Sequence, residues 1–335
     1  MSRQDRLHAD LDRGFEALER GDIEEAEAAL ARCNRIDRKH ADVVTLGAAV
    51  ADARGDADVA LERYSALAEL QPDNPMPRIC IARIQLRDVG DPDAALDTLD
   101  AAFDFIDEEP DLIEAILIRT EALIAIEDLE NARAAIGELS TSVIEDAELA
   151  LDLGELALAA EDPLLAARWA EAAQRDAEHR ADALHLLGRV HEASGDRAAM
   201  IEAWQQVRTL DAERPARVSI SDDELERIAS EALAELPDTA RAKLEHVPIL
   251  IDGAPSQELV ADGLDPRTLG VIDGPTLAEP DAVGSPTHIR LFKKNLEAIA
   301  IDLDHLAAEV RITVLHETAH YFGLEEDDLE KLGLD

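Results

Sequence analysis

The chain has 335 residues, enough for two domains, and its 47% apolar content allows a substantial core. Its 75 Asp and Glu residues outnumber 32 Lys and Arg residues, which gives a formal net charge of −43. This charge repels nucleic acid and anionic membranes, so the sequence excludes both as partners and favours basic partners or substrates. Alternatively, the acidic residues form a solvated surface like that of proteins from salty cytoplasms, which predicts stability that rises with KCl concentration.

Three features of the sequence bear on its cellular location. The two cysteines, Cys33 and Cys80, lie far apart and form no disulfide framework, which favours a reducing compartment. The first 14 residues, MSRQDRLHADLDRG, hold no apolar run like that of a signal peptide. No apolar run approaches the roughly 18 residues that would cross a bilayer. We therefore expect a soluble, cytoplasmic protein.

A two-residue signature recurs through the first two thirds of the chain. It occurs at Gly21-Asp22, Gly55-Asp56, Gly90-Asp91, Glu127-Asp128, Glu161-Asp162 and Gly195-Asp196, at spacings of 34, 35, 37, 34 and 34 residues. Five positions after the start of each stands a mostly small residue: Ala26, Ala60, Ala95, Ala132, Ala166 and Met200. Gly tolerates left-handed geometry and Asp caps a following helix, so each signature predicts a turn between two helices.

Helix pairs of this kind cannot bury their apolar faces alone, so neighbouring pairs must stack into a solenoid. The period and the small residues resemble the tetratricopeptide repeat (TPR) over about residues 7–213, in six units. Arg83 and Thr120 depart from the pattern, because the repeat has a small residue at their positions. The resemblance implies a concave surface that binds a protein or peptide, either a partner or the substrate. The alternative is a structural spacer or a dimerisation arm.

The helical repetition stops at Arg214-Pro215, and the composition of the chain changes there. A capping box at residues 221–224 predicts the start of a new helix. We therefore divide the chain into a helical repeat domain at residues 1–215 and a second domain at residues 216–335.

The second domain continues with short apolar runs and loops. The runs at residues 246–252 and 288–292 predict strands, whereas 253–286 is rich in Gly and Pro and predicts a loop with room for one short strand. The strand at 288–292 could pair with an extended peptide, as sheet edges do. A long helix is expected over about 302–322, ended by Gly323. This order of elements predicts a small α+β domain.

The long helix carries two histidines four residues apart, His316 and His320, with Glu317 directly after the first. Residues i and i+4 lie on one face of a helix, so both imidazoles can reach one metal ion. Glu317 stands about 100° round the helix from His316, close enough to hold a water on that metal without being a ligand. Two nitrogen ligands and one carboxylate base are typical of zinc metallopeptidases, with Glu317 as the catalytic residue.

A catalytic zinc needs three protein ligands and one open position, and only 15 residues follow His320. A glutamate on a separate later helix therefore has no room. Gly323 can turn the chain back toward the metal, and a cluster of acidic residues follows it at 325–328. We therefore expect a carboxylate as the third ligand, Glu326 by its spacing, with Asp327 as the alternative.

From residue 221 onward the chain resembles the minimal zincin-like metalloprotease family of bacteria, whose motif is HExxHxxGxxD. The similarity covers the segments LEHVPILID, LGVIDGPTL, HIRLFKKNLE and VRITVLHETAHYFGL. It implies that His316 and His320 bind zinc and that Glu317 is the general base. Glu326 stands where the family usually has Asp, which leaves the third ligand open between Glu326 and its neighbour.

We therefore expect a mainly α protein: a TPR-like α-solenoid followed by a small α+β zincin-like metallopeptidase domain. The expected function is zinc-dependent hydrolysis of peptide bonds, with the repeats docking a partner or the substrate. The alternative is a non-catalytic TPR scaffold for protein–protein interaction, whose zincin-like domain binds zinc but is inactive. The presence of Glu317 favours the hydrolase, because a structural zinc site has no use for a base at that position.

Overall fold

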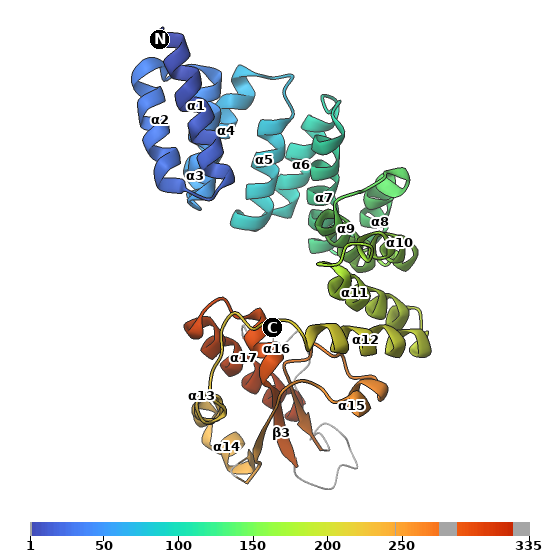
Figure 1. The fold of residues 1–335 in the computed structure, drawn as a ribbon. Helices are drawn as coiled ribbons and strands as arrows, with labels where there is room; N and C mark the ends of the chain where they lie inside the picture. Colours follow the sequence, from blue (N-terminus) through green and yellow to red (C-terminus); the bar gives the residue numbers. More distant parts are fainter. Residues whose placement is uncertain (1, 245, 275–286, 324–335) are drawn as a thin grey trace. The chain divides into compact units, whose positions relative to one another are not determined.

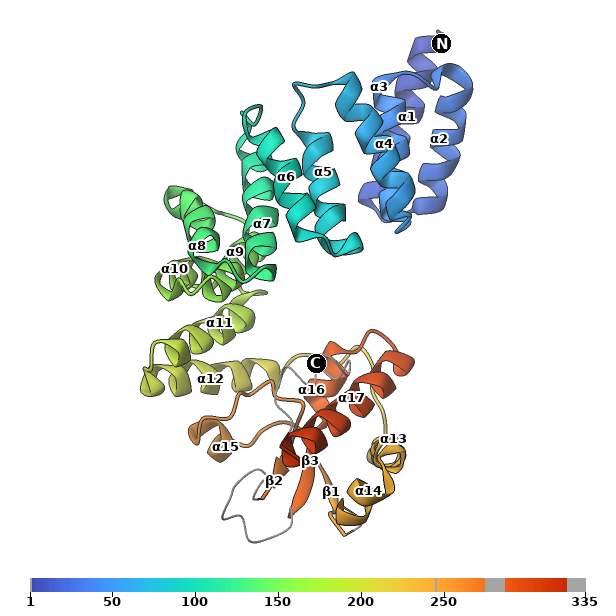
Figure 2. The ribbon, with the colours of Figure 1, turned by 180° about the vertical axis from the view of Figure 1, so that it is seen from behind.

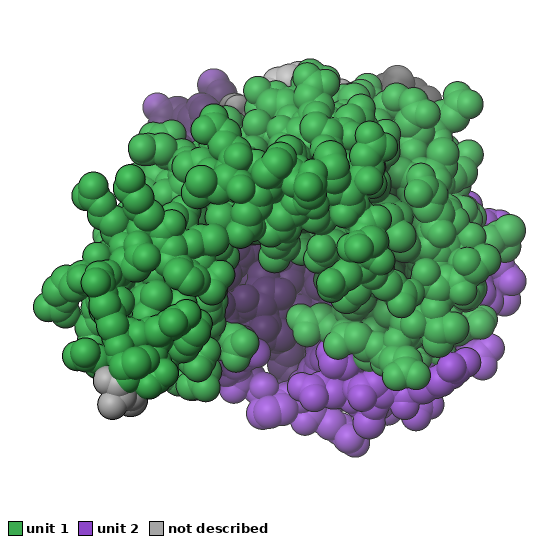
Figure 3. All heavy atoms as spheres, turned by 90° about the horizontal axis from the view of Figure 1, so that it is seen from above, with its two compact units in different colours: residues 1–172 green, residues 173–335 purple. Residues whose placement is uncertain are grey.

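The computed structural model describes residues 2–244, 246–274 and 287–323. The chain divides into two compact units, Met1–Ala172 (unit 1) and Ala173–Asp335 (unit 2), coloured separately in Figure 3. The sixth pair of helices thus belongs to the same compact unit as the sheet. The domain limits 1–215 and 216–335 were set by the end of the sequence repeats, whereas the compact units are defined by contacts between residues. Those domain limits stay a prediction.

Unit 1 is a stack of helical hairpins (Figure 1). Its helices are α1 (Arg3–Glu19), α2 (Ile23–Asp37), α3 (Ala41–Ala53), α4 (Ala57–Leu70), α5 (Met76–Ile84), α6 (Pro92–Phe103), α7 (Glu109–Ala125), α8 (Leu129–Gly137), α9 (Ala147–Ala159) and α10 (Pro163–Ala173). A π-helical turn, Gln85–Val89, extends α5, and a 3-10 turn, Glu138–Thr141, extends α8. From α1 to α9 each helix packs against the next one in the chain, as stacked repeats require.

The recurring signature forms the turn inside each hairpin, as predicted. Its first residue is left-handed at every occurrence, with φ of +57° to +74° at Gly21, Gly55, Gly90, Glu127, Glu161 and Gly195. Five of the six aspartates accept a hydrogen bond from the backbone amide three residues on: Asp22, Asp91, Asp128, Asp162 and Asp196. The turn thus reverses the chain and caps the next helix at the same time.

Small residues let neighbouring helices approach closely, both within a hairpin and between successive hairpins. The alanines that follow the signature are fully buried: Ala26, Ala60, Ala95, Ala132 and Ala166. A Cβ added at Gly14 would lie 2.6 Å from a methyl carbon of Leu46, and one at Gly188 would lie 2.0 Å from Trp204 Nε1. These contacts leave no room for a larger side chain at either glycine.

The two departures from the repeat pattern are accommodated within the helical stack. Thr120 is fully buried, and its hydroxyl donates to the carbonyl of Ile116 at 2.8 Å. Arg83 is partly buried, pairs with Asp52 of α3, and lies 4.0 Å from Glu114 of α7. The third and fourth hairpins therefore form despite the larger side chains.

Glu127 provides a test of the turn geometry, because a Cβ in the left-handed region costs roughly 1–2 kcal/mol. We expect Glu127→Gly to raise the free energy of unfolding by about 0.5–1 kcal/mol, the net of relieved strain and the greater chain entropy of glycine. The control is Gly55→Ala, which adds a Cβ at φ +73° with no atom within 4 Å and should be destabilising. Urea denaturation measures both changes, and a shift in the same direction would contradict the prediction.

Unit 2 combines helices with a three-stranded sheet (Figure 2). Its elements are α11 (Arg180–Ala193), α12 (Arg197–Asp211), α13 (Asp222–Glu235), α14 (Asp238–Leu244), β1 (Ile249–Asp252), α15 (Gln257–Ala261), β2 (Gly270–Asp273), β3 (His288–Phe292), α16 (Lys293–Ile299) and α17 (Leu303–Tyr321). The strand order is β1-β3-β2, with β3 parallel to β1 and antiparallel to β2. The helices and strands predicted for this part are present, and α15 and α16 were not predicted.

The expected pairing of residues 288–292 with an extended peptide is wrong. These residues form β3, which is the central strand of the described sheet, so β1 and β2 occupy both of its edges. The outer strands, β1 and β2, hold the positions at which another chain could pair.

The core of unit 2 lies between one face of the sheet and the helices α13, α16 and α17. Alternate residues of β3, Ile289 and Leu291, are fully buried there, because side chains alternate between the faces of a strand. The helices contribute Leu225, Ala229, Ala232, Leu296, Ala300, Leu306, Val310 and Val314. This packing fixes the orientation of α17, the helix that carries the histidine pair.

A partly buried polar network joins the hairpin α11–α12 to the loop that leads into β2. Arg267 of this loop pairs with Asp211 of α12 at 2.8 Å and with Asp182 of α11 at 2.7 Å. Burial alone would raise the pKa of Asp182, but the hydrogen bond from Arg214 and the charge of Arg267 hold that pKa below its ordinary value. The ionised network therefore ties the sixth hairpin to the approach to β2.

A second contact strengthens the same junction. Asp265 Oδ2, two residues before Arg267, lies 2.7 Å from His185 Nε2 of α11. Nearby, Val260 of α15 is fully buried against Met200 and Trp204 of α12. Both polar and apolar contacts thus make α11–α12 part of the structure around the sheet.

A substitution at Arg267 measures how much this junction contributes to the stability of the fold. We expect Arg267→Met to lower the free energy of unfolding by about 3 kcal/mol, because two partly buried carboxylates lose a cation. The control is Arg227→Met: Arg227 also pairs with two carboxylates, Glu224 and Glu231, but at the surface, where such pairs contribute little. Equal losses in thermal unfolding would mean that the Arg267 network is not structurally important.

Candidate metal centre

The ends of the helix α17 are set by a capping residue and a glycine. The side chain of Asp302 accepts a hydrogen bond from the amide of His305 at 2.8 Å and so caps its first turn. Gly323 follows its last turn with φ +82°, a conformation that favours glycine. The expected helix over about 302–322 is confirmed as Leu303–Tyr321.

The side chains of His316 and His320 converge on one point beside α17. Their Nε2 atoms lie 2.9 Å apart, at hydrogen-bonding distance, and their ring planes meet at 80° with centroids 4.5 Å apart. Two nitrogen ligands of a tetrahedral zinc ion stand about 3.3 Å apart, given zinc–nitrogen distances of about 2.0–2.1 Å. The pair therefore fits a shared metal ion after a shift of a few tenths of an ångström.

Glu317 is anchored to the sheet. Its Oε2 accepts a hydrogen bond from the backbone amide of Ile272 in β2 at 3.2 Å. Because β2 is an outer strand, this amide can be directed at α17 instead of at β3. The hydrogen bond fixes the carboxylate on the side of the helix that faces β2.

The strand and the helix come closest at Gly270. A Cβ at Gly270 would lie 2.7 Å from Cγ2 of Thr313, one helical turn before Glu317, and 3.2 Å from the carbonyl oxygen of Arg290. Any larger residue must push β2 away from α17 or from β3. Glycine at this position therefore allows the Ile272 amide to reach Glu317.

We expect Gly270→Ala to lower the free energy of unfolding by about 1–3 kcal/mol, the usual effect of overpacking. Gly253→Ala is the matched control, because no atom lies within 4 Å of a Cβ at Gly253. Thermal unfolding of the two variants gives the comparison. If they are equally stable, β2 and α17 are not as tightly packed as the geometry indicates.

Polar side chains on the other face of the sheet brace the outer strands. Arg290 of β3 pairs with Asp252 of β1 at 2.6 Å and lies 3.7 Å from Asp273 of β2. His288 Nε2 lies 2.5 Å from the same Asp273 carboxylate. This set was not predicted, although two polar residues at alternate positions of an apolar strand are a visible signal in the sequence. The set holds β2, and with it the Ile272 amide, in place.

The third ligand expected at Glu326, or alternatively at Asp327, lies outside the described residues. Within the described residues, no group of three or more His, Cys, Asp or Glu side chains is arranged to hold a metal ion. The structure therefore brings together the two predicted histidine ligands and places Glu317 against β2. The assignment of the third ligand stays a prediction.

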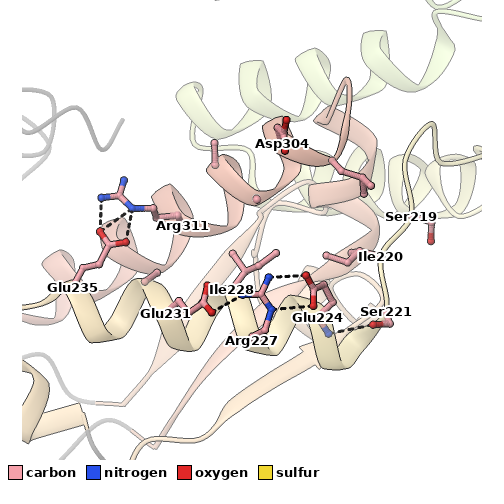
Figure 4. A pocket seen from close by; sticks show the side chains of 14 residues that line it. Ser219, Ile220, Ser221, Glu224, Arg227, Ile228, Glu231, Glu235, Asp304 and Arg311 are labelled. Atoms are coloured by element: carbon pink, nitrogen blue, oxygen red, sulfur yellow. Dashed lines mark hydrogen bonds and ion pairs between the residues drawn. The ribbon is translucent and has the colours of Figure 1, made fainter.

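A cavity of about 760 Å³ lies between α13 and α17 (Figure 4). Arg227 on its wall pairs with Glu224 and Glu231, and Arg311 pairs with Glu235. Neither His316 nor His320 lines it. Since both arginines are already ion-paired, the cavity offers no obvious anion site, and the chemistry of the chain is better sought at the histidine pair.

Residues 244–334 match the family model described as zincin-like metallopeptidase. No curated protein matches the chain. PilW, a type IV pilus biogenesis factor, is similar in structure with a TM-score of 0.53 at 16% identity, over 62% of this chain and 94% of PilW. PilF of Pseudomonas aeruginosa gives 0.51 at 18% identity, over 63% and 95% of the two chains. A tetratricopeptide repeat protein from Parabacteroides merdae gives 0.46 at 15% identity, over 72% and 91%.

At these identities PilW and PilF, the two with TM-scores above 0.5, show the fold alone. Together with the family match they confirm tetratricopeptide-type repeats fused to a C-terminal zincin-like domain. The expected fold class, a mainly α protein with a small α+β C-terminal domain, is also confirmed. Among the helices of the described residues, none has the length and apolarity needed to span a bilayer.

Proposed function

We propose that the chain is a zinc-dependent metallopeptidase whose repeats dock a protein partner or the peptide substrate. The observation that supports it most directly is the 2.9 Å approach of the Nε2 atoms of His316 and His320. The match of residues 244–334 to the zincin-like metallopeptidase family supports the same chemistry.

In this proposal His316 and His320 hold the zinc ion, with Glu326 as the third ligand and Asp327 as its alternative. A bound zinc ion acts as a Lewis acid toward a water molecule and toward the scissile carbonyl. The two imidazoles would bind it in their neutral form, each through a ring nitrogen.

Glu317 is the general base of the proposed reaction. It takes a proton from the attacking water and delivers it to the leaving amine as the peptide bond breaks. The hydrogen bond from the Ile272 amide holds one carboxylate oxygen, and a carboxylate can accept several hydrogen bonds, so the group can hold a water as well. The carboxylate is thus oriented before the substrate arrives.

The proposal includes a cytoplasmic location. Cys33 and Cys80 are both free and buried, as is common in a reducing compartment. The repeats then act as a docking surface for cytoplasmic proteins or peptides.

Three variants of the full chain test the proposal, with bound zinc and cleavage of a quenched fluorescent peptide library as readouts. Glu317→Gln should keep zinc and lose cleavage by about 10²–10⁴-fold, because only the base is removed. His316→Ala should lose both. His305→Ala is the control on the same helix, where His305 lies 3.1 Å from Glu309, and it should keep both.

Two other outcomes of this experiment would contradict the proposal. Stoichiometric zinc in the wild type without cleavage of any library peptide would contradict the peptidase and favour the inactive scaffold. Absence of zinc after a zinc-replete, chelator-free purification would contradict the metal centre itself.

A further inference from the structure

A second cavity, of about 380 Å³, opens on unit 1 between α7 and the start of α9. The chain that enters α9 closes one side of it. Six of the ten lining residues are apolar and the other four are carboxylates, with no Lys, Arg or His among them. The cavity between α13 and α17 differs, because two arginines are among its lining residues.

The apolar part of this cavity comes from two helices and one loop. Ile113 and Leu117 lie one turn apart on α7, and Leu149 lies on the first turn of α9. Val143 in the loop before α9 is 80% exposed, an unusually open position for a large apolar residue. An apolar side chain inserted here would remove all four from water.

The acidic part of the cavity consists of Glu109, Glu114, Glu145 and Asp146. One oxygen of Asp146 caps α9 by accepting from the amide of Leu149 at 2.9 Å. Burial raises the pKa of Glu114 above its ordinary value. The nearby positive charge of Arg83 opposes this shift, and the negative charge of Asp111 adds to it. An additional cation would therefore stabilise the ionised form of Glu114 in its present place.

The chemistry excludes two other occupants. An acidic peptide tail finds no cation among the lining residues. A bare metal ion finds no group of three or more ligating side chains within the described residues. An apolar group flanked by positive charge satisfies both parts of the cavity.

We propose that this cavity docks a protein segment in which an apolar side chain stands next to arginine or lysine residues. The apolar side chain packs on Ile113, Leu117 and Leu149, and the cationic groups reach the carboxylates while their methylene stems cover apolar surface. The net charge of −43 attracts such a segment from a distance. This inference rests on the proposed docking role of the repeats and is independent of the metal centre.

Fluorescence anisotropy tests the inference with a labelled peptide of alternating leucine and arginine. The full chain carries Glu317→Gln, so that the probe is not cleaved. Two further probes replace arginine with glutamate or leucine with serine, and both should bind at least tenfold more weakly than the first. Equal binding of the serine probe would show plain attraction of positive charge to an acidic protein and would overturn the inference.

Paired charge reversals locate the site. Glu109→Lys with Glu145→Lys should weaken binding of the leucine–arginine probe about tenfold or more, because two exposed carboxylates of the cavity become cations. Glu62→Lys with Glu69→Lys makes the same change of net charge at exposed positions on α4 and should change binding less than threefold. Equal effects of the two pairs would overturn the assignment.

A conservative variant tests the apolar part without a change of charge. Val143→Ser removes apolar surface from a position that is 80% exposed, so the fold should be unaffected while binding weakens severalfold. Unchanged binding would contradict insertion of an apolar side chain. Zinc content is measured in the same samples. Bound zinc without peptide binding would contradict only the docking cavity. Peptide binding without bound zinc would contradict only the proposed metallopeptidase.

Discussion

The packing of α17 against β2 is the contact on which the proposed chemistry depends. One helix carries both histidines and the glutamate, so their mutual placement follows from helical geometry. Their placement relative to the rest of the domain does not, and it is set by the packing of α17 on the sheet. The Ile272 amide holds Glu317, and Gly270 lets the strand come close enough to Thr313 for that hydrogen bond to form.

The sheet is in turn held from both faces. The apolar face packs on α13, α16 and α17, and the polar face is braced by Arg290 and two aspartates. The loop before β2 is tied through Arg267 to α11–α12, a hairpin that belongs to the helical repetition by its sequence pattern. A repeat hairpin thus supports the sheet beside the candidate metal centre, and the repeats and the zincin-like domain are in direct contact.

Much of this arrangement was predictable because its signals are local. The signature ending in Asp predicts a turn and a cap within a few residues, and the spacing of His316 and His320 determines that they share a helical face. The strand at residues 288–292 was likewise correctly predicted from its apolar run. In each case the residues that determine the local structure lie within a few positions of it in the sequence.

The features that the sequence did not reveal depend on distant parts of the chain. The central place of β3 follows from pairing with two strands, one about 40 residues earlier. Glu317 accepts a hydrogen bond from a backbone amide, and no residue type in the sequence indicates such a donor. The helices α15 and α16 have five and seven residues, too short for an apolar period to show. Glu326 and Asp327 lie outside the described residues.

X-ray absorption at the zinc edge, on the purified full chain loaded with zinc, tests the central claim most directly. We expect one four-coordinate zinc ion per chain, with scattering from two imidazoles and the remaining ligands oxygen at about 2.0–2.1 Å. Bound zinc, and with it this spectrum, should be lost in His316→Ala and should persist in His305→Ala. A zinc ion without two imidazole ligands, or a spectrum that is the same in His316→Ala, would contradict a metal centre at this histidine pair.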